Sequence, residues 1–582
     1  MTQDFGTDLI TREVVLSGIR AAVDEMEVVI GRAAMSPIFR EKKDYFMGVY
    51  DPDGRMVHAL IGLSGAGLVQ PVLERYPAAS IKPGDIFFYN DPYSSAGAVQ
   101  HLPDVVVLMP AHDRDGTLLG FAAAYGHVED IGGLRHGSGS FDARDIFNEG
   151  IAYPPIRVGQ DFEVFEEFMR VLVRNSRVPD LIKGDWRALM AGCRLCVERL
   201  QALASRWGTG AYEDTVAWTI ARSAAIAERV VREQMVDGRY VSRQKIDGRL
   251  AGRESITVAA ELSKSGSALT MDLRESDDQV DVPLNYMSSL AGTRLLIASL
   301  LLVLDEKLLI NEGALSVLKS VEARPGSIVR PNYPAPLFAR STVKNALAVC
   351  VADLLSQATS GRMNAPSPVY CVATFSFPGI NPPRPAFAET LGVGLGARSF
   401  GDGPDVIYGH ASRNYPVDQV EPGHPVRIER YEIRQDTGGA GQYRGGCGVR
   451  RDVRVLVDCT LTPRLGNTTI PSPGVAGGHP GGLARLRIQR TSGVVEEHPG
   501  LANSIPMQAG DVAILETSGG GGWGDPRRRP TEAVLRDVRE GFVSEEQAQA
   551  LYGVCVENGA LDRERTSLAR GPADAVAARE RA

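Results

Sequence analysis

Two kinds of hydrophobic periodicity follow one another along this chain, and its fold must accommodate both. Between residues 9 and 34 apolar side chains recur every three or four positions, which predicts one amphipathic helix that ends before Pro37. From 45 to 130 the pattern becomes strand-like, with hairpin signals at residues 51–54 and 113–116. The sequence therefore predicts a mixed α+β fold in which a β-rich N-terminal region follows a long first helix.

The 582 residues are far more than one hydrophobic core usually serves, so we expect a multidomain protein. Changes in periodicity and in Gly and Pro content suggest where its parts begin and end. We predict five segments: an N-terminal α/β region (1–160), a helical middle (161–235), a mixed α/β domain (236–365), a Gly/Pro-rich β domain (366–525) and a helical C-terminal tail (526–582).

Charge and composition exclude several classes of partner. The net charge is −8 and the two signs are interspersed, which argues against nucleic-acid binding. The longest apolar run, Leu295 to Leu304, is about half the length needed to cross a bilayer and predicts a buried helix. The start has no signal-peptide pattern, and the seven cysteines have no disulfide-framework spacing. We expect a cytoplasmic protein that binds neither nucleic acid nor membrane.

A CxxC pair and two glycine-rich stretches have structural explanations that require no ligand. Cys193 and Cys196 form a CxxC inside a helical pattern, with no second pair or nearby His to complete a zinc site, so we expect helix packing. The glycine-rich stretches 438–448 and 518–526 invite a phosphate-loop interpretation, but no helix follows them and no P-loop motif occurs in the chain. We interpret them as tight turns in a β-rich domain and expect no nucleotide site in this chain.

Side chains able to bind a metal ion gather between residues 40 and 150, at the ends of predicted strands. They are Asp44, the His101/Asp104 pair and the His127/Asp130 pair, and both pairs have the spacing H-x-x-D. In a turn, residues i and i+3 come close enough to address one ion. Imidazole plus carboxylate ligands suit a divalent ion such as Zn²⁺, Mn²⁺ or Fe²⁺, although five ligands exceed the tetrahedral zinc count. Spacing alone leaves open that each residue is structural or solvated.

The order of short motifs resembles the hydantoinase B/oxoprolinase family along nearly the whole chain. In the first half the segments are KKDYFMGVYDPDGRMV, GDIFFYNDPY, HLPDVVVL, GHVEDIGG, DIFNEGI and YPPI. In the second half they are VPLNYMSSLAGTRLLI, NEGAL, RPNYPAP, DTGGAGQYRGGCGVRRD and TSGGGGWGDP. Each motif is moderately specific, whereas their ordered succession is highly specific.

This resemblance implies a metal-binding subunit of a hetero-oligomer. Such subunits act on a small-molecule substrate with a hydantoinase A-type partner, which carries ATP and Mg²⁺. The family's metal ligands correspond to all five residues named above. Asn90, Asp91 and Glu149 are candidates to contact those ligands, and the catalytic residues stay unassigned.

The resemblance leaves the reaction open between alternatives. The leading interpretation is ATP-dependent hydrolysis of a cyclic amide, such as a hydantoin, oxoproline or a lactam. The alternatives are a biotin-independent, ATP-dependent ketone carboxylase of the acetone or acetophenone type, and a non-catalytic structural paralogue. Segments 58–67 and 93–101 depart from the family pattern, which leaves the substrate class open. The sequence also does not identify the metal or the stoichiometry.

Overall fold

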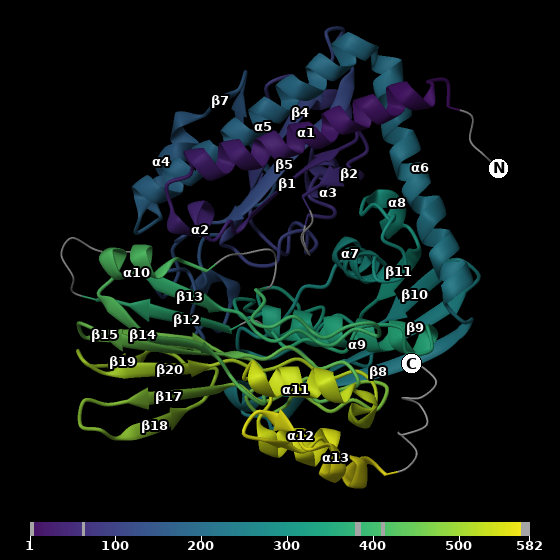
Figure 1. Cartoon of the computed structure of the whole chain (residues 1–582). Helices are drawn as coiled ribbons and strands as arrows, with labels where there is room; N and C mark the ends of the chain where they lie inside the picture. Colours follow the sequence, from purple (N-terminus) through teal and green to yellow (C-terminus); the bar gives the residue numbers. More distant parts are fainter. Residues whose placement is uncertain (1–4, 61–64, 370, 379–385, 409–413, 572–582) are drawn as a thin grey trace. The chain divides into compact units, whose positions relative to one another are not determined.

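The computed structural model describes residues 5–60, 65–369, 371–378, 386–408 and 414–571, which Figure 1 shows as ribbons. They form two compact units. The first contains the chain up to Val241 and Val258–Lys344, and the second contains Ser242–Thr257 and most of the chain from Asn345 onward. Both helices and several sheets are present, which confirms the mixed α+β, multidomain prediction. The boundaries of the five predicted segments stay a prediction.

The first unit is built on a seven-stranded antiparallel sheet of order β2-β1-β5-β4-β3-β6-β7. Its strands are β1 (Tyr45–Tyr50), β2 (Met56–Ala59), β3 (Ile86–Tyr89), β4 (Asp104–His112), β5 (Leu118–His127), β6 (Ile156–Gln160) and β7 (Glu163–Val164). The two predicted hairpins are confirmed as β1–β2 and β4–β5. In the central hairpin, every residue of β4 after Asp104 is buried, so this strand lies in the core of the unit.

Long helices cover one face of this sheet. Helix α1 (Leu9–Ala33) is capped at its N-terminus by Asp8, whose carboxylate accepts the N–H groups of Ile10 and Thr11. Its buried stripe packs against α5 (Pro179–Trp207), which in turn lies on β4 and β5. Figure 1 shows α1 and α5 side by side. The predicted first helix is thus confirmed, and α4 (Glu166–Arg174) and α6 (Thr209–Gln234) complete the predicted helical middle.

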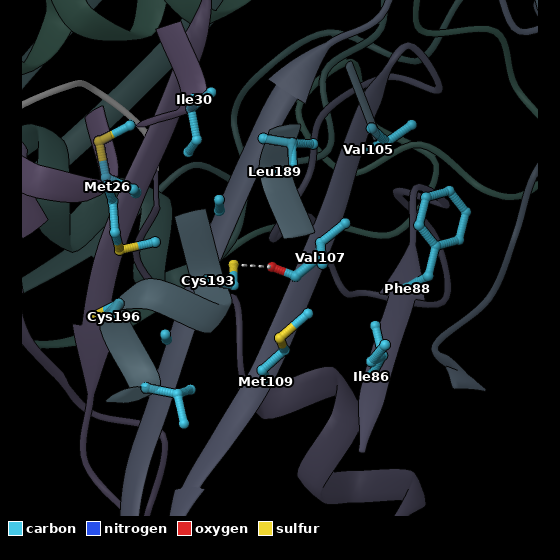
Figure 2. Packing of buried hydrophobic residues seen from close by; sticks show 14 of the residues in the cluster. Met26, Ile30, Ile86, Phe88, Val105, Val107, Met109, Leu189, Cys193 and Cys196 are labelled. Carbon is cyan, nitrogen blue, oxygen red and sulfur yellow. Dashed lines mark hydrogen bonds between the residues drawn. The ribbon is translucent and has the colours of Figure 1, made fainter. Parts of the chain in front are cut away.

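The two cysteines of the CxxC motif lie in this core, as Figure 2 shows. Both are fully buried on α5, and the Cys193 thiol donates a hydrogen bond to the Val107 carbonyl of β4 at 3.5 Å. Burial raises the pKa of the Cys196 thiol to about 12. Both side chains therefore behave as small apolar residues, and the expectation of ordinary helix packing is confirmed.

The chain continues into a four-stranded sheet of order β11-β10-β9-β8. The strands are β8 (Gly238–Asp247), β9 (Ser255–Ser265), β10 (Ala268–Asp272) and β11 (Leu318–Glu322); the helices of this region are α7 (Leu290–Leu301), α8 (Glu312–Leu315) and α9 (Ser341–Ala358). Helix α7 confirms that the longest apolar run forms a buried helix. Among the described helices, none combines the length and apolar character needed to cross a membrane.

The second unit contains two antiparallel sheets, of order β13-β12-β16-β19 and β14-β15-β20-β17-β18. Their strands are β12 (Cys371–Ser376), β13 (Phe387–Leu391), β14 (Val426–Ile433), β15 (Val449–Val455), β16 (Cys459–Arg464), β17 (Arg485–Gln489), β18 (Val495–His498), β19 (Ile505–Met507) and β20 (Val512–Glu516). The helical tail contains α11 (Thr531–Arg539), α12 (Glu545–Tyr552) and α13 (Arg563–Arg570). The tail is tied to the β region by Arg529, which donates to Asp402 at 2.6 and 2.8 Å.

Residues 518–522 of the glycine-rich stretch 518–526 are buried, but tight turns are not the main reason for the glycines. A Cβ added at Gly519 or Gly520 would meet a backbone carbonyl oxygen within 2.0 Å, and neither residue has a positive φ. Glycine is needed because backbone segments pack directly on one another. The N–H groups of residues 519–522 donate to carbonyls of this same unit, so they are not available to bind phosphate. The turn interpretation is corrected, whereas the rejection of a phosphate loop holds.

Candidate metal centre

The β4–β5 hairpin brings three of the predicted ligands to one end of the large sheet. Asp104 is the first residue of β4 and His127 is the last of β5, and the two are directly opposite in the strand register. His101 lies one turn before β4, where its carbonyl accepts the Asp104 N–H at 3.2 Å. The H-x-x-D turn and the antiparallel pairing together explain why residues 26 positions apart meet.

The potential ligand atoms form a small triangle. His101 Nε2 lies 2.8 Å from Asp104 Oδ1, His127 Nδ1 lies 3.1 Å from His101 Nε2, and His127 Nδ1 lies 3.3 Å from Asp104 Oδ1. A tetrahedral zinc ion with ligand distances of about 2.0–2.1 Å separates its ligand atoms by about 3.3 Å. The triangle therefore has the size of one face of a metal coordination shell.

Protonation also suits ion binding. His101 is almost fully buried, and this burial, together with the nearby Arg340, lowers its pKa to about 3. Its imidazole is thus neutral at physiological pH, the form that binds metals. Burial acts to raise the pKa of Asp104, but His101, His127 and Arg340 hold it well below its usual range. The group thus offers neutral nitrogen and anionic oxygen donors at one point.

Asp44 lies next to this group. Its carbonyl accepts the His127 N–H at 3.0 Å, and it directly precedes β1. Burial raises the pKa of its carboxyl, while the neighbouring His127 opposes this effect and Asp104 adds to it. Among the described residues, however, the set whose ligand atoms all lie within 4.8 Å of one another contains only His101, Asp104 and His127.

The structure does not bring Asp130 into the group. Its fully buried carboxylate accepts the backbone N–H and the Nη1 of Arg177, both at 2.7 Å, and the Gly137 N–H at 3.2 Å. The first H-x-x-D precedes a strand and forms a turn, whereas the second follows a strand. Arg177 also donates to the carbonyls of Gly132 and Gly133, so this pair organises the loop that follows His127.

The three candidate supporting residues have different surroundings. Asn90 donates to the Leu102 carbonyl at 2.7 Å, and so fixes the loop that carries His101. Asp91 accepts the N–H groups of Tyr93 and Ser94, as in an Asx turn. In the described part of the chain, Asp91 forms these bonds within its own loop and forms none with a predicted ligand.

Glu149 is almost fully buried, and its Oε1 accepts two backbone N–H groups, those of Leu337 and Phe338, each at 2.7 Å. Burial nevertheless raises the pKa of its carboxyl to about 8. Its other oxygen, Oε2, has no hydrogen-bond partner. Glu149 therefore anchors a chain segment that arrives from almost 190 residues later in the sequence.

Residues that the sequence analysis missed also border the group. The Arg340 Nη2 lies 3.4 Å from Asp104 Oδ2, across 236 positions of sequence, and no spacing rule would have found it. Lys344, one helical turn later, interacts electrostatically with both Arg340 and Asp104. Glu129 lies inside the HVED motif, between His127 and Asp130, and burial raises its pKa to about 7. The H-x-x-D spacing alone does not indicate it. Residues 61–64, in one segment that departs from the family pattern, lie outside the described residues.

Several known proteins are similar to this chain in sequence and in fold. The chain is 28% identical to the caprolactamase subunit beta of Pseudomonas jessenii, over 97% of this chain and 99% of that protein. The crystal structure of the ATP-dependent caprolactamase from this organism matches with a TM-score of 0.84 and 26% identity, covering 97% and 100% of the two chains.

A nucleotide-free acetone carboxylase structure shares the fold, with a TM-score of 0.83 at 21% identity, covering 98% of this chain and 83% of that one. The hydantoinase B/oxoprolinase family profile matches residues 8–526. That range includes the hairpin with its histidine and aspartate group as well as both sheets of the second unit. The chain belongs to the hydantoinase B/oxoprolinase family.

Proposed function

We propose that this chain is the metal-binding subunit of a cytoplasmic, ATP-dependent cyclic-amide hydrolase that acts with an ATP-binding hydantoinase A-type partner. The observation that carries the proposal is the triangle of His101, Asp104 and His127, whose ligand atoms are 2.8 to 3.3 Å apart. Three such contacts cannot all be good hydrogen bonds, because two imidazole nitrogens and one carboxylate oxygen supply too few correctly placed protons. A shared divalent cation satisfies all three atoms.

The types of side chain at the site indicate which metal ions it would bind. His101, Asp104 and His127 would bind Zn²⁺, Mn²⁺ or Fe²⁺, with Asp44 as the neighbouring candidate for a further ligand. Asp130 would act through Arg177, by shaping the loop after His127. When bound, such an ion polarises a carbonyl oxygen or lowers the pKa of a water molecule.

The reaction needs ATP because an unstrained amide is a poor electrophile. The balanced reaction converts a cyclic amide, ATP and two water molecules into the ring-opened amino acid, ADP and phosphate; the ring C–N bond and the γ-phosphate bond break. The Gly519–Gly522 N–H groups are hydrogen-bonded within the chain, which supports a nucleotide site on another subunit. The name of the caprolactamase relative, subunit beta, supports a heteromeric enzyme. The seven free, buried cysteines fit a reducing cytoplasm.

Metal analysis of the purified chain tests the metal assignment. The wild type is expected to hold about one divalent ion per chain, and Asp104→Asn is expected to lose most of it. Asp115→Asn is the matched control, because Asp115 is exposed at the opposite end of the same hairpin. Equal metal content in all three proteins, or none in the wild type, would contradict the proposal and favour a structural paralogue.

Turnover with the partner subunit tests the reaction class. ADP release is expected to require both subunits and a cyclic amide such as oxoproline, hydantoin or a lactam, and to proceed without bicarbonate. Strict dependence on bicarbonate and a ketone would instead identify a carboxylase. Calorimetric titration of the chain alone with ATP and Mg²⁺ is expected to show no binding at micromolar concentrations. Tight ATP binding by this chain would mean that the subunit roles are wrongly assigned.

A further inference from the structure

We propose that the start of α9 is an oxyanion site for a phosphoryl group beside the metal centre, formed by Arg340, Ser341 and Lys344. The inference deepens the proposed function and rests on it: the group bound would be the phosphoryl of an activated substrate, or the phosphate released from it. All three residues belong to the first unit, as do His101, Asp104 and His127.

Arg340 has more hydrogen-bond donors than its surroundings use. Its Nη2 lies 3.4 Å from Asp104 Oδ2 and its Nη1 lies 3.3 Å from the Phe338 carbonyl, and both contacts are longer than ordinary charge-assisted hydrogen bonds. Its Nε is buried and has no hydrogen-bond partner. A guanidinium only 13% exposed with such loose contacts can accept a better-placed anion, and its planar fork matches phosphoryl oxygens.

Lys344 adds a second cation on the same helix face, because residues i and i+4 lie one above the other. It interacts electrostatically with Arg340 and with Asp104, and burial together with Arg340 lowers its pKa to about 8. Two largely buried cations thus lie within electrostatic reach of Asp104, which is also a proposed metal ligand. An anion bound at this helix start would be attracted by both side chains.

Ser341 is the first residue of α9, which is 18 residues long. Its side-chain oxygen is buried and has no hydrogen-bond partner, and the residue is only 8% exposed. The positive end of the helix dipole lies at the same position and favours an anion. A hydroxyl, a guanidinium and an ammonium group within one helical turn therefore match the acceptor oxygens and charge of a phosphoryl group.

Glu149 fixes this helix start. By accepting the N–H groups of Leu337 and Phe338, it anchors the segment immediately before Arg340. Arg340 in turn contacts Asp104. The helix start and the metal group are thereby held next to each other, so that a phosphorylated carbonyl at the metal group would have its phosphoryl oxygens near the two cations.

Calorimetric titration of the purified full-length chain with inorganic phosphate tests the site, before and after removal of metal with a chelator. We expect saturable binding at millimolar phosphate in both forms. Arg340→Ala and Lys344→Ala are each expected to weaken it at least about tenfold, which corresponds to loss of one charge-assisted contact. Lys307→Ala, at an exposed position, is the control and is expected to bind like the wild type.

Each alternative outcome is decisive. Absence of saturable phosphate binding by the wild type, or unchanged binding by both variants, overturns the inference. Binding that disappears with the metal and ignores the variants would place phosphate on the ion alone. Arg340→Lys keeps the positive charge and Ser341→Ala nearly keeps the size of the side chain, so neither variant is expected to misfold. Both are expected to bind phosphate with intermediate affinity. Titration of the metal-free chain needs no turnover, so its failure is distinguishable from failure of the proposed hydrolase activity.

Discussion

Glu149 makes the pH dependence of stability a sharp test of the structure. Burial raises the pKa of its carboxyl from 4.5 to about 8. Between these values the unfolded chain releases the proton while the folded chain keeps it. The free energy of unfolding therefore falls as pH rises, because deprotonation favours the unfolded state. Glu149→Gln, a neutral mimic of the protonated acid that can still accept the Leu337 and Phe338 N–H groups, is expected to abolish this component.

The magnitude follows from the two pKa values. A shift from 4.5 to about 8 corresponds to an upper value of about 5 kcal/mol in the alkaline limit. Of this, roughly 2–3 kcal/mol develops between pH 5 and pH 7. For a unit of about 330 residues, with an unfolding entropy of about 2.1 cal/mol/K per residue, 1 kcal/mol changes the melting temperature by about 1.5 °C. The melting temperature of the wild type is thus expected to fall by roughly 3–5 °C more than that of Glu149→Gln over this pH range.

Differential scanning fluorimetry at several pH values is the assay, with the metal-free chain used throughout. Glu306→Gln is the matched control, since Glu306 is exposed in the same unit, and it is expected to follow the wild type. Parallel melting curves for the wild type and Glu149→Gln would refute the reasoning, because they would mean that Glu149 ionises as readily in the folded chain as in the unfolded one.

Three further expectations concern other parts of the chain. Arg177→Ala is expected to weaken metal binding by about 10- to 100-fold, because it releases the loop after His127. Competition with a chromophoric chelator measures this affinity, and an unchanged value would mean that Asp130 and Arg177 do not support the site. Gly520→Ala is expected to abolish soluble expression of folded protein, because its Cβ would lie 2.0 Å from a backbone carbonyl; a well-folded variant would contradict the packing described. Cys193 and Cys196 are expected to resist thiol reagents until the chain unfolds, and rapid labelling of the native chain would show that α5 is not packed as described.

Local patterns in the sequence were enough to predict most elements. The periodicity of residues 9–34 predicts α1, and turn residues at 113–116 predict the β4–β5 hairpin, because both depend on neighbours within a few positions. The same locality explains why His101 and Asp104 were recognised as a pair. Asp130 lies apart from this group for a related reason: an identical spacing leads to a different geometry when it follows a strand instead of preceding one.

Contacts between segments far apart in the sequence could not be predicted from local patterns. Arg340 and Lys344 follow a Pro-rich segment that carries no ligand signature, and only the packing of Leu337 and Phe338 on Glu149 explains their place beside Asp104. The glycines at 519–522 were likewise assigned to turns, because a sequence does not reveal which backbone segments will pack on one another.

The proposed metal group comes from one short segment, residues 101–127, whereas the proposed oxyanion site comes from residues 340–344, far away in the sequence. The two tasks need different geometric precision, which is consistent with this division. Binding an ion requires ligand atoms placed within tenths of an ångström, and a β-hairpin with a preceding turn provides such rigidity over 27 residues. An oxyanion needs only donors and positive charge of roughly correct placement, which a helix start from a remote segment can supply. Substitutions at His101 or His127 are therefore expected to abolish metal binding, whereas substitutions at Arg340 or Lys344 are expected to retain the metal and weaken phosphate binding in graded steps.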